Sequence, residues 1–141
     1  IQVRKELADT WKDHGIKSGQ EYAILTDEIT KAWSGKTTRE YKDFKGLKKE
    51  NLRDNMTTLE IVLNMLAEVT TTEITKVEYP LGLEENKEVA KKGGSIVGNT
   101  RKEIEKTTGR PVITSKNAID LQGLFNGVIN HLEEKNSTKE E

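Results

Sequence analysis

Two lysines followed by two glycines, about two-thirds of the way along the chain, come closest to a spacing that could bind a phosphate. In a phosphate-binding loop the backbone N–H groups of glycines surround the anion, and a lysine follows at the start of a helix, as in G-x-x-x-x-G-K-[ST]. Here Lys91 and Lys92 come before Gly93 and Gly94, and no strand pattern precedes them. Because the order is reversed, the sequence does not predict such a loop.

Helix termination explains the same residues. Lysines in a last helical turn offset the negative end of the helix dipole, and glycine often ends a helix in the left-handed conformation. We therefore expect a helix over about 84–92 to stop at Gly93, and Ser95 to cap a second helix over about 95–108. The N-terminus of a helix attracts anions without any motif, so anion binding stays open as an alternative.

Two stretches of the chain carry a local excess of positive charge. Residues 87–102 hold five basic residues and one acidic residue, and residues 41–53 hold five basic and two acidic residues. If the stretches meet in space, they could bind a nucleic-acid backbone or an acidic protein face, although charge runs are more often solvated helix faces. Such binding would weaken steeply with salt. The candidate residues are Lys45, Lys48, Lys49, Arg53, Lys91, Lys92, Arg101 and Lys102.

Catalytic and metal-binding patterns are not apparent in the sequence. His14 and His131 are isolated in sequence, whereas a zinc site needs about four donors. No serine stands in a nucleophile context such as G-x-S-x-G. Trp11 and Trp33 fall on apolar helical stripes, where core packing is the default interpretation. We therefore expect a protein that is not an enzyme and has no metal or cofactor.

The elements that would position these residues are helices with clear start signals. A serine or threonine followed three residues later by glutamate forms a capping box, in which each side chain satisfies a free backbone N–H group. Glycines at 15, 35, 46 and 109 are placed to end helices. The three boxes are Ser18–Glu21, Thr37–Glu40 and Thr57–Glu60.

The helix predicted near 58–78 is apolar round most of its girth, with only Glu60, Asn64 and Glu68 as a narrow polar stripe. Such a helix should be covered on several sides, which makes it the central helix. A last helix is expected from about residue 117, and its apolar residues are Ala118, Leu121, Leu124, Phe125, Val128 and Leu132. The sequence thus predicts an all-α bundle of about six helices, with one domain over 1–134 and a polar, disordered tail over 135–141.

Composition sets limits on partners and compartment. Hydrophobic residues make up only 33% of the chain, so a thin core could be completed by a second copy, as a homodimer. With 23 basic and 24 acidic residues, net charge gives no argument for nucleic acid. The lack of cysteine and of a membrane-spanning stretch favours a cytoplasmic protein without membrane contact. Because the chain begins at Ile1, we expect it to be part of a longer protein.

Residues 44–61, "FKGLKKENLRDNMTTLEI", carry a family resemblance. The "KGLKK" stretch, followed shortly by Met56 and an apolar helix, resembles the DNA damage-inducible protein D (DinD) family. A second stretch, with Val97, Gly98, Arg101, Ile104, Gly109 and Pro111, and the segment "EYAILTDEITKAW" at 21–33 are consistent with the same family. The resemblance covers most of residues 2–114.

The resemblance implies the C-terminal helical region of a bacterial protein of the DNA-damage (SOS) response, without the family's antirepressor-like N-terminal part. It implies action by binding, on a DNA-repair or recombination protein and potentially on DNA, and not by catalysis. It supplies no established functional residues, so the basic candidates depend on charge alone. The alternative is a helical interaction or oligomerisation module that makes no nucleic-acid contact.

Overall fold

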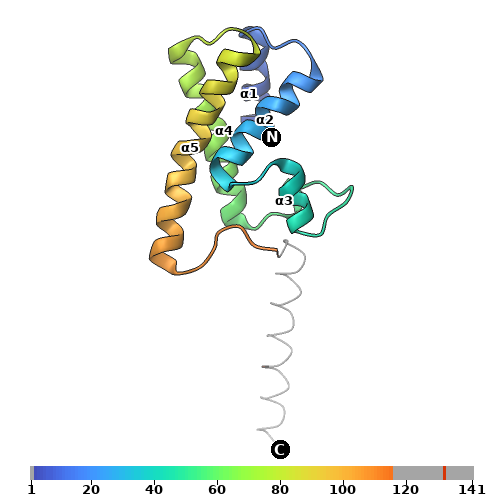
Figure 1. The fold of residues 1–141 in the computed structure, drawn as a ribbon, viewed down its shortest axis with the longest axis vertical. Coiled ribbons are helices and arrows are strands. Elements are labelled where there is room, and N and C mark those ends of the chain that lie inside the picture. The colour runs from blue at the N-terminus through green and yellow to red at the C-terminus, as the bar shows by residue number, and fades with distance from the viewer. Residues whose placement is uncertain (1, 116–131, 133–141) are drawn as a thin grey trace, which may run out of the picture.

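The computed structural model describes residues 2–115 and residue 132, and all regular structure in this part of the chain is helical. This confirms the all-α prediction and the long helix expected near 58–78. The predicted helix from about 117, apart from Leu132, and the predicted tail lie outside the described residues. The elements are α1 (Gln2–Asp13), α2 (Gly19–Ser34), α3 (Thr38–Phe44), the 3-10 turn η1 (Arg53–Asn55), α4 (Thr58–Glu78) and α5 (Gly82–Thr108) (Figure 1).

The helices pack around the two longest, α4 and α5, which lie side by side (Figure 1). The most extensive packing joins α5 to α2, and α1 packs against α4. The short helix α3 contacts α2 and, with the loop that follows it, projects from the side of the bundle (Figure 1). This arrangement leaves a hollow between α1, α2, α3 and α4, and this hollow is the candidate site.

Local capping chemistry sets most helix ends as the sequence predicts. In all three predicted boxes the hydroxyl of the cap residue accepts from the glutamate N–H group, and the glutamate accepts from the cap's own N–H group. Helices α2 and α5 end at Gly35 and Gly109, with φ of 82° and 70°. A positive φ is easy for glycine because it has no Cβ.

The expected helix break at Gly93 is wrong, because α5 runs without interruption from Gly82 to Thr108 and Ser95 caps nothing. The glycines are needed for close helix packing. A Cβ atom at Gly93 would overlap the Thr71 hydroxyl on α4, and one at Gly94 would lie 2.5 Å from the Ala32 Cβ atom on α2. One turn later, a Cβ atom at Gly98 would lie 2.6 Å from the Ala32 carbonyl oxygen. Small residues therefore let α5 touch two helices at once.

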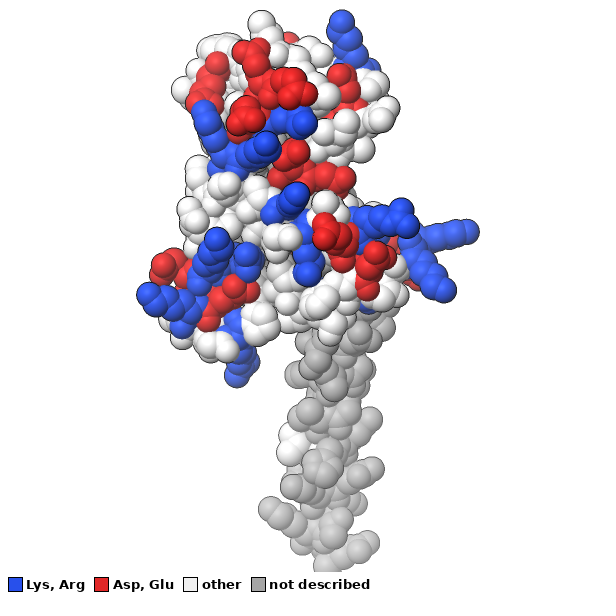
Figure 2. All heavy atoms as spheres, viewed as in Figure 1, with Lys and Arg blue, Asp and Glu red and all other residues white. Residues whose placement is uncertain are grey.

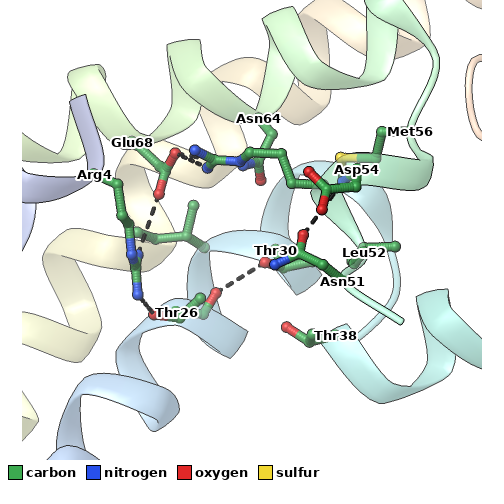
Figure 3. Close-up of a pocket in the computed structure, with 12 residues that line it drawn as sticks. Arg4, Thr26, Thr30, Thr38, Asn51, Leu52, Asp54, Met56, Asn64 and Glu68 are labelled. Carbon is green, nitrogen blue, oxygen red and sulfur yellow. Dashed lines mark hydrogen bonds and ion pairs between the residues drawn. The ribbon is translucent and has the colours of Figure 1, made fainter. Parts of the chain in front are cut away.

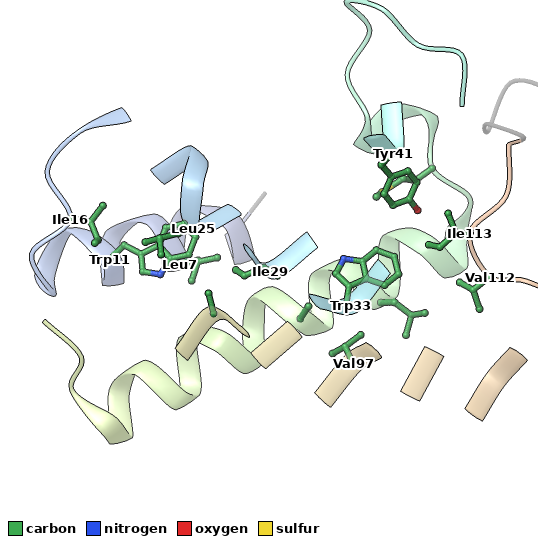
Figure 4. Packing of buried hydrophobic residues seen from close by; sticks show 14 residues of the cluster. Leu7, Trp11, Ile16, Leu25, Ile29, Trp33, Tyr41, Val97, Val112 and Ile113 are labelled. Carbon is green, nitrogen blue, oxygen red and sulfur yellow. The ribbon is translucent and has the colours of Figure 1, made fainter. Parts of the chain in front are cut away.

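The two tryptophans are core residues, as predicted, and each is fully buried. Trp11 lies at one end of the apolar cluster with neighbours from α1 and α2, and Trp33 lies further along it, between Ile29 and Ile113 (Figure 4). The Trp33 ring packs against Tyr41 with 6.2 Å between ring centroids. Val112 and Ile113 are buried in the same cluster, so the segment after α5 returns to the bundle.

Helix α4 packs against α1, α2 and α5, as expected of a central helix, but one of its apolar faces is left partly exposed. Its polar residues Glu60 and Glu68 point inward and are buried, whereas four large apolar residues on the opposite face are about half-exposed. Inward positions such as Ala67 and Thr71 are small, which lets α5 approach closely. The four outward residues are Leu59, Val62, Leu66 and Val69.

Candidate binding site

Lys45, the first basic candidate, is buried in the structure. Its side chain has no exposed surface, and its Nζ atom lies 2.9 Å from Oε1 of the equally buried Glu60. The Tyr41 hydroxyl donates to the other Glu60 oxygen. Burial, together with the hydrogen bond and the charge of Glu60, raises the pKa of the Tyr41 phenol, so it stays a protonated donor. Lys45 thus joins α3 to α4 from inside.

Arg101, from the second basic stretch, approaches the same buried group. Its Nε atom donates to the Trp33 carbonyl oxygen at 2.8 Å, and its Nη1 atom lies 2.8 Å from Glu105 Oε1. Its positive charge partly offsets the rise in the Tyr41 pKa. The two basic stretches therefore do come together, but through Lys45 and Arg101 near the core.

The other lysine candidates lie on the surface. Lys92 is 2.8 Å from Glu78, and Lys91 is 3.6 Å from Glu88. The exposed residues Lys48, Lys49 and Lys102 form no ion pair within the described part of the chain. On the face shown in Figure 2, basic and acidic side chains are interspersed. A nucleic-acid contact through these lysines stays a prediction.

Arg53 is part of the most distinctive polar arrangement in the described structure. Its Nη2 atom lies 2.5 Å from Glu68 Oε1, and the Nη1 atom of Arg4 lies 3.2 Å from Glu68 Oε2 (Figure 3). Arg4 also donates to the Thr26 hydroxyl. The Glu68 side chain is only 4% exposed, whereas those of Arg4 and Arg53 are 35% and 31% exposed. One buried carboxylate from α4 thus holds two guanidinium groups, from α1 and η1.

The two arginines line a cavity of about 410 Å³ (Figure 3). Its wall combines the apolar residues Ile29, Leu52 and Met56 with polar residues, which include Thr26, Thr30, Thr38, Asn51, Asp54 and Asn64. Three of its residues, Arg4, Thr26 and Thr38, also line a neighbouring cleft of about 810 Å³. The charged residues that α2, α3 and the next loop add to this cleft are Asp27, Arg39, Lys42, Asp43 and Lys48. The cavity and the cleft share one wall, and we call them together the arginine cleft.

The donor groups of the arginine cleft are of the kind that pairs with anionic groups. Each guanidinium has five N–H donors in a planar fork, more than its bonds to Glu68 and Thr26 require. Glu68 fixes the two forks in place, so little side-chain freedom remains to be lost on binding. In the part of the chain that the structure describes, no group of three or more histidine, cysteine or acidic side chains could hold a metal ion. What the geometry offers is charge-assisted hydrogen bonding to a carboxylate or phosphate.

Sequence reasoning identified Arg53 and Lys48 at this site but missed Arg4 and Arg39. Arg4 lies 49 residues from Arg53, and nothing local to either residue indicates that they meet. One signal was present: Glu68 lies in a strongly apolar helix, and a buried carboxylate requires cationic partners. That argument could have predicted a pair for Glu68, but not its identity.

Comparison with known proteins identifies the chain by family. A family model described as the DinD C-terminal domain matches residues 1–120, which include helices α1 to α5 and the whole arginine cleft. No curated protein and no solved structure matches. Among the described helices, none has the length and apolar character needed to cross a membrane.

Proposed function

The chain belongs to the DinD C-terminal domain family, and from this premise we propose that it serves the bacterial response to DNA damage by binding a protein of the repair or recombination machinery. Membership of the family supports a role related to DNA damage. The proposed action is recognition in the cytoplasm, without catalysis and without a cofactor. The partner would present an acidic segment to the arginine cleft.

The observation that carries this proposal is the convergence of Arg4 and Arg53 on the buried Glu68 at the wall of a cavity. A volume of about 410 Å³ is in the range of binding pockets, and it suits one or two side chains. A partner carboxylate could accept from both guanidinium forks while threonine hydroxyl groups bind its neighbours. Since no bond is made or broken, such a site would act by selecting and holding a partner.

Charge favours a protein over nucleic acid as the partner. The residues that line the arginine cleft include five basic and four acidic side chains, a net charge of only +1. The full chain carries −1. A weak field of this kind gives little long-range attraction to a polyanion. Recognition would instead depend on short-range, geometric pairing of arginine with carboxylate.

Direct DNA binding is the second candidate, because Lys48 and Lys49 are exposed on the loop that borders the cleft. Together with Arg39 and Lys42 they could follow a phosphate backbone without entering the cavity. This alternative predicts binding that falls steeply between low and moderate salt.

A binding experiment with the full chain separates these proposals. Purified bacterial recombination and repair proteins, and labelled single-stranded DNA at about 50 mM and about 200 mM salt, would each be titrated against the wild-type chain. The variant Arg4→Lys/Arg53→Lys keeps both charges but loses the planar forks. We expect it to weaken protein binding by about tenfold or more, and Lys106→Gln, an exposed change at a residue that does not line the arginine cleft, to leave binding unchanged.

Three outcomes would count against the proposal. Salt-sensitive DNA binding that is lost in Lys48→Gln/Lys49→Gln would favour the second candidate. Protein binding that survives the double arginine change would remove the arginine cleft from the mechanism. Turnover of any substrate would contradict the non-catalytic role.

A further inference from the structure

The outer face of α4 carries an apolar stripe that the described elements leave about half-exposed. Its four large side chains are exposed to similar extents: Leu59 by 40%, Val62 by 52%, Leu66 by 43% and Val69 by 39%. All four lie on one face of the single helix α4. Residues that face the bundle, such as Leu63 and Ala67, are buried. Scattered apolar residues are normal on a surface, but a continuous helical stripe indicates an interaction site.

The spacing of the stripe is that of a coiled-coil seam. Its residues follow one another at intervals of three, four and three, which are the a and d positions of two heptads. The same seam continues into Glu73 and Lys76, whose side chains are 66% and 49% exposed. A partner for such a seam is another helix with the same apolar spacing, and α4 itself has that spacing.

We propose that the apolar stripe of α4 binds the same stripe of a second copy of this chain, with the two α4 helices antiparallel. In this register Leu59 packs against Val69 of the partner subunit, and Val62 packs against Leu66 of the partner subunit. A two-fold axis passes close to residue 64, and the four apolar layers of the seam are filled symmetrically, as an isologous interface requires.

Charge selects the antiparallel orientation. In a parallel pair, Glu73 would face its own copy in one layer of the seam, and like charges in facing positions repel. In the antiparallel pair, Glu73 lies beyond the apolar layers, near the partner's Leu59. The exposed Arg110 lines one groove with Leu59, so it would lie close to the incoming glutamate. The stripe is short, so the dimer is weak and depends on concentration.

Sedimentation of the full chain tests the association. Between about 10 μM and about 1 mM, we expect the mean mass to rise from 15.9 kDa toward twice that value. The change Val62→Gln/Leu66→Gln should raise the dissociation constant about tenfold or more, while circular dichroism stays that of the folded chain because both side chains are already half-exposed. Val77→Gln is the matched control: it lies on the same helix, is 77% exposed and is two turns beyond the last residue of the stripe. A chain that stays monomeric at the highest concentration overturns the proposal.

Disulfide trapping tests the orientation, and the chain has no cysteine of its own to interfere. Mixing a Val62→Cys chain with a Leu66→Cys chain under oxidising conditions should give a cross-linked heterodimer, since the two Cβ atoms would then be within disulfide reach. Either chain alone should cross-link much less. Efficient cross-linking of the Leu66→Cys chain with itself would show a parallel pair and overturn the register. No cross-link in any mixture would overturn the interface.

Discussion

Most helices turn an apolar face to the core and a polar face to solvent, but α4 does the reverse. Its carboxylates point into the bundle, and its large apolar side chains point out. On the inner face, Glu60 and Glu68 are buried, and each has cationic partners from another element. On the outer face, Leu66 and its neighbours are about half-exposed. The comparison shows that a central apolar helix can leave one apolar face exposed. Its inner face can be specified by ion pairs and small residues, and its apolar face is then left for a partner.

The largest expected effect comes from breaking the inner ion pair. Glu60→Gln removes the carboxylate that pairs with the buried charge of Lys45, and breaking a buried ion pair typically costs about 3–5 kcal/mol of unfolding free energy. The outer-face change Glu73→Gln should alter it by less than about 0.5 kcal/mol. Urea denaturation of both variants measures the contrast. Adding Lys45→Met to Glu60→Gln should recover part of the lost stability. If Glu60→Gln and Glu73→Gln were equally stable, the inner and outer faces of α4 would not differ in this respect.

Neighbouring residues on α4 provide the most direct test of the two faces. Leu63 is 3% exposed and Val62 is 52% exposed, although they are adjacent in sequence. Leu63→Ala should cost about 2–5 kcal/mol, because it removes buried methyl groups and leaves a cavity. Val62→Ala should change the unfolding free energy by less than about 0.5 kcal/mol at dilute, monomeric concentration. Similar losses in thermal denaturation would mean that the stripe is covered in the monomer.

The glycines of α5 provide a third contrast, between a tight helix contact and an open one. Gly94→Ala adds a Cβ atom only 2.5 Å from Ala32 Cβ and 2.7 Å from the Ile29 carbonyl oxygen. Overpacking of this kind costs about 1–3 kcal/mol, which outweighs the helix-propensity gain of up to about 1 kcal/mol. Gly19→Ala, at the start of α2, meets nothing within 4 Å and should be neutral or slightly stabilising. A stabilised Gly94→Ala variant would show that α2 and α5 can move apart at no cost.

The sequence predicts the helices well because their ends are set by local chemistry. Each capping box joins residues three apart, and Gly35 and Gly109 end their helices through their own φ angles. The same local reasoning fails at Gly93 and Gly94. Glycine can end a helix or allow a close contact, and only Thr71 and Ala32, far away in the chain, decide between these roles.

The candidate site is only partly predictable for the same reason. Charge runs identify basic residues, but they do not show that Lys45 is paired with a buried Glu60 while Lys48 and Lys49 are exposed. Hydrophobic periodicity likewise identifies the stripe on α4 without showing which face is inside. The orientation follows from ion pairs between distant residues, such as Arg4 and Glu68, which are 64 positions apart, and no local pattern contains that information.

The smallest expected effect compares two glutamates that occupy the same position of a capping box in different surroundings. Glu60 completes its box in the core, whereas Glu40 completes its box on the surface, where a hydrogen bond from the Thr37 backbone N–H group, and then the Thr37 hydroxyl, lowers its pKa below the ordinary 4.5. Because the unfolded chain then binds the proton first as pH falls, Glu40 contributes stability above pH 4.5 that is lost as pH falls through its lower folded pKa.

Glutamine can form the same box without titrating. Glu40→Gln should therefore leave the melting temperature almost unchanged at neutral pH and make its decline between about pH 6 and pH 3 slightly shallower than in the wild type. If the melting temperatures of the variant and the wild type decline equally as pH falls, the charge of Glu40 contributes nothing to stability. The contrast between the two boxes is then entirely one of burial.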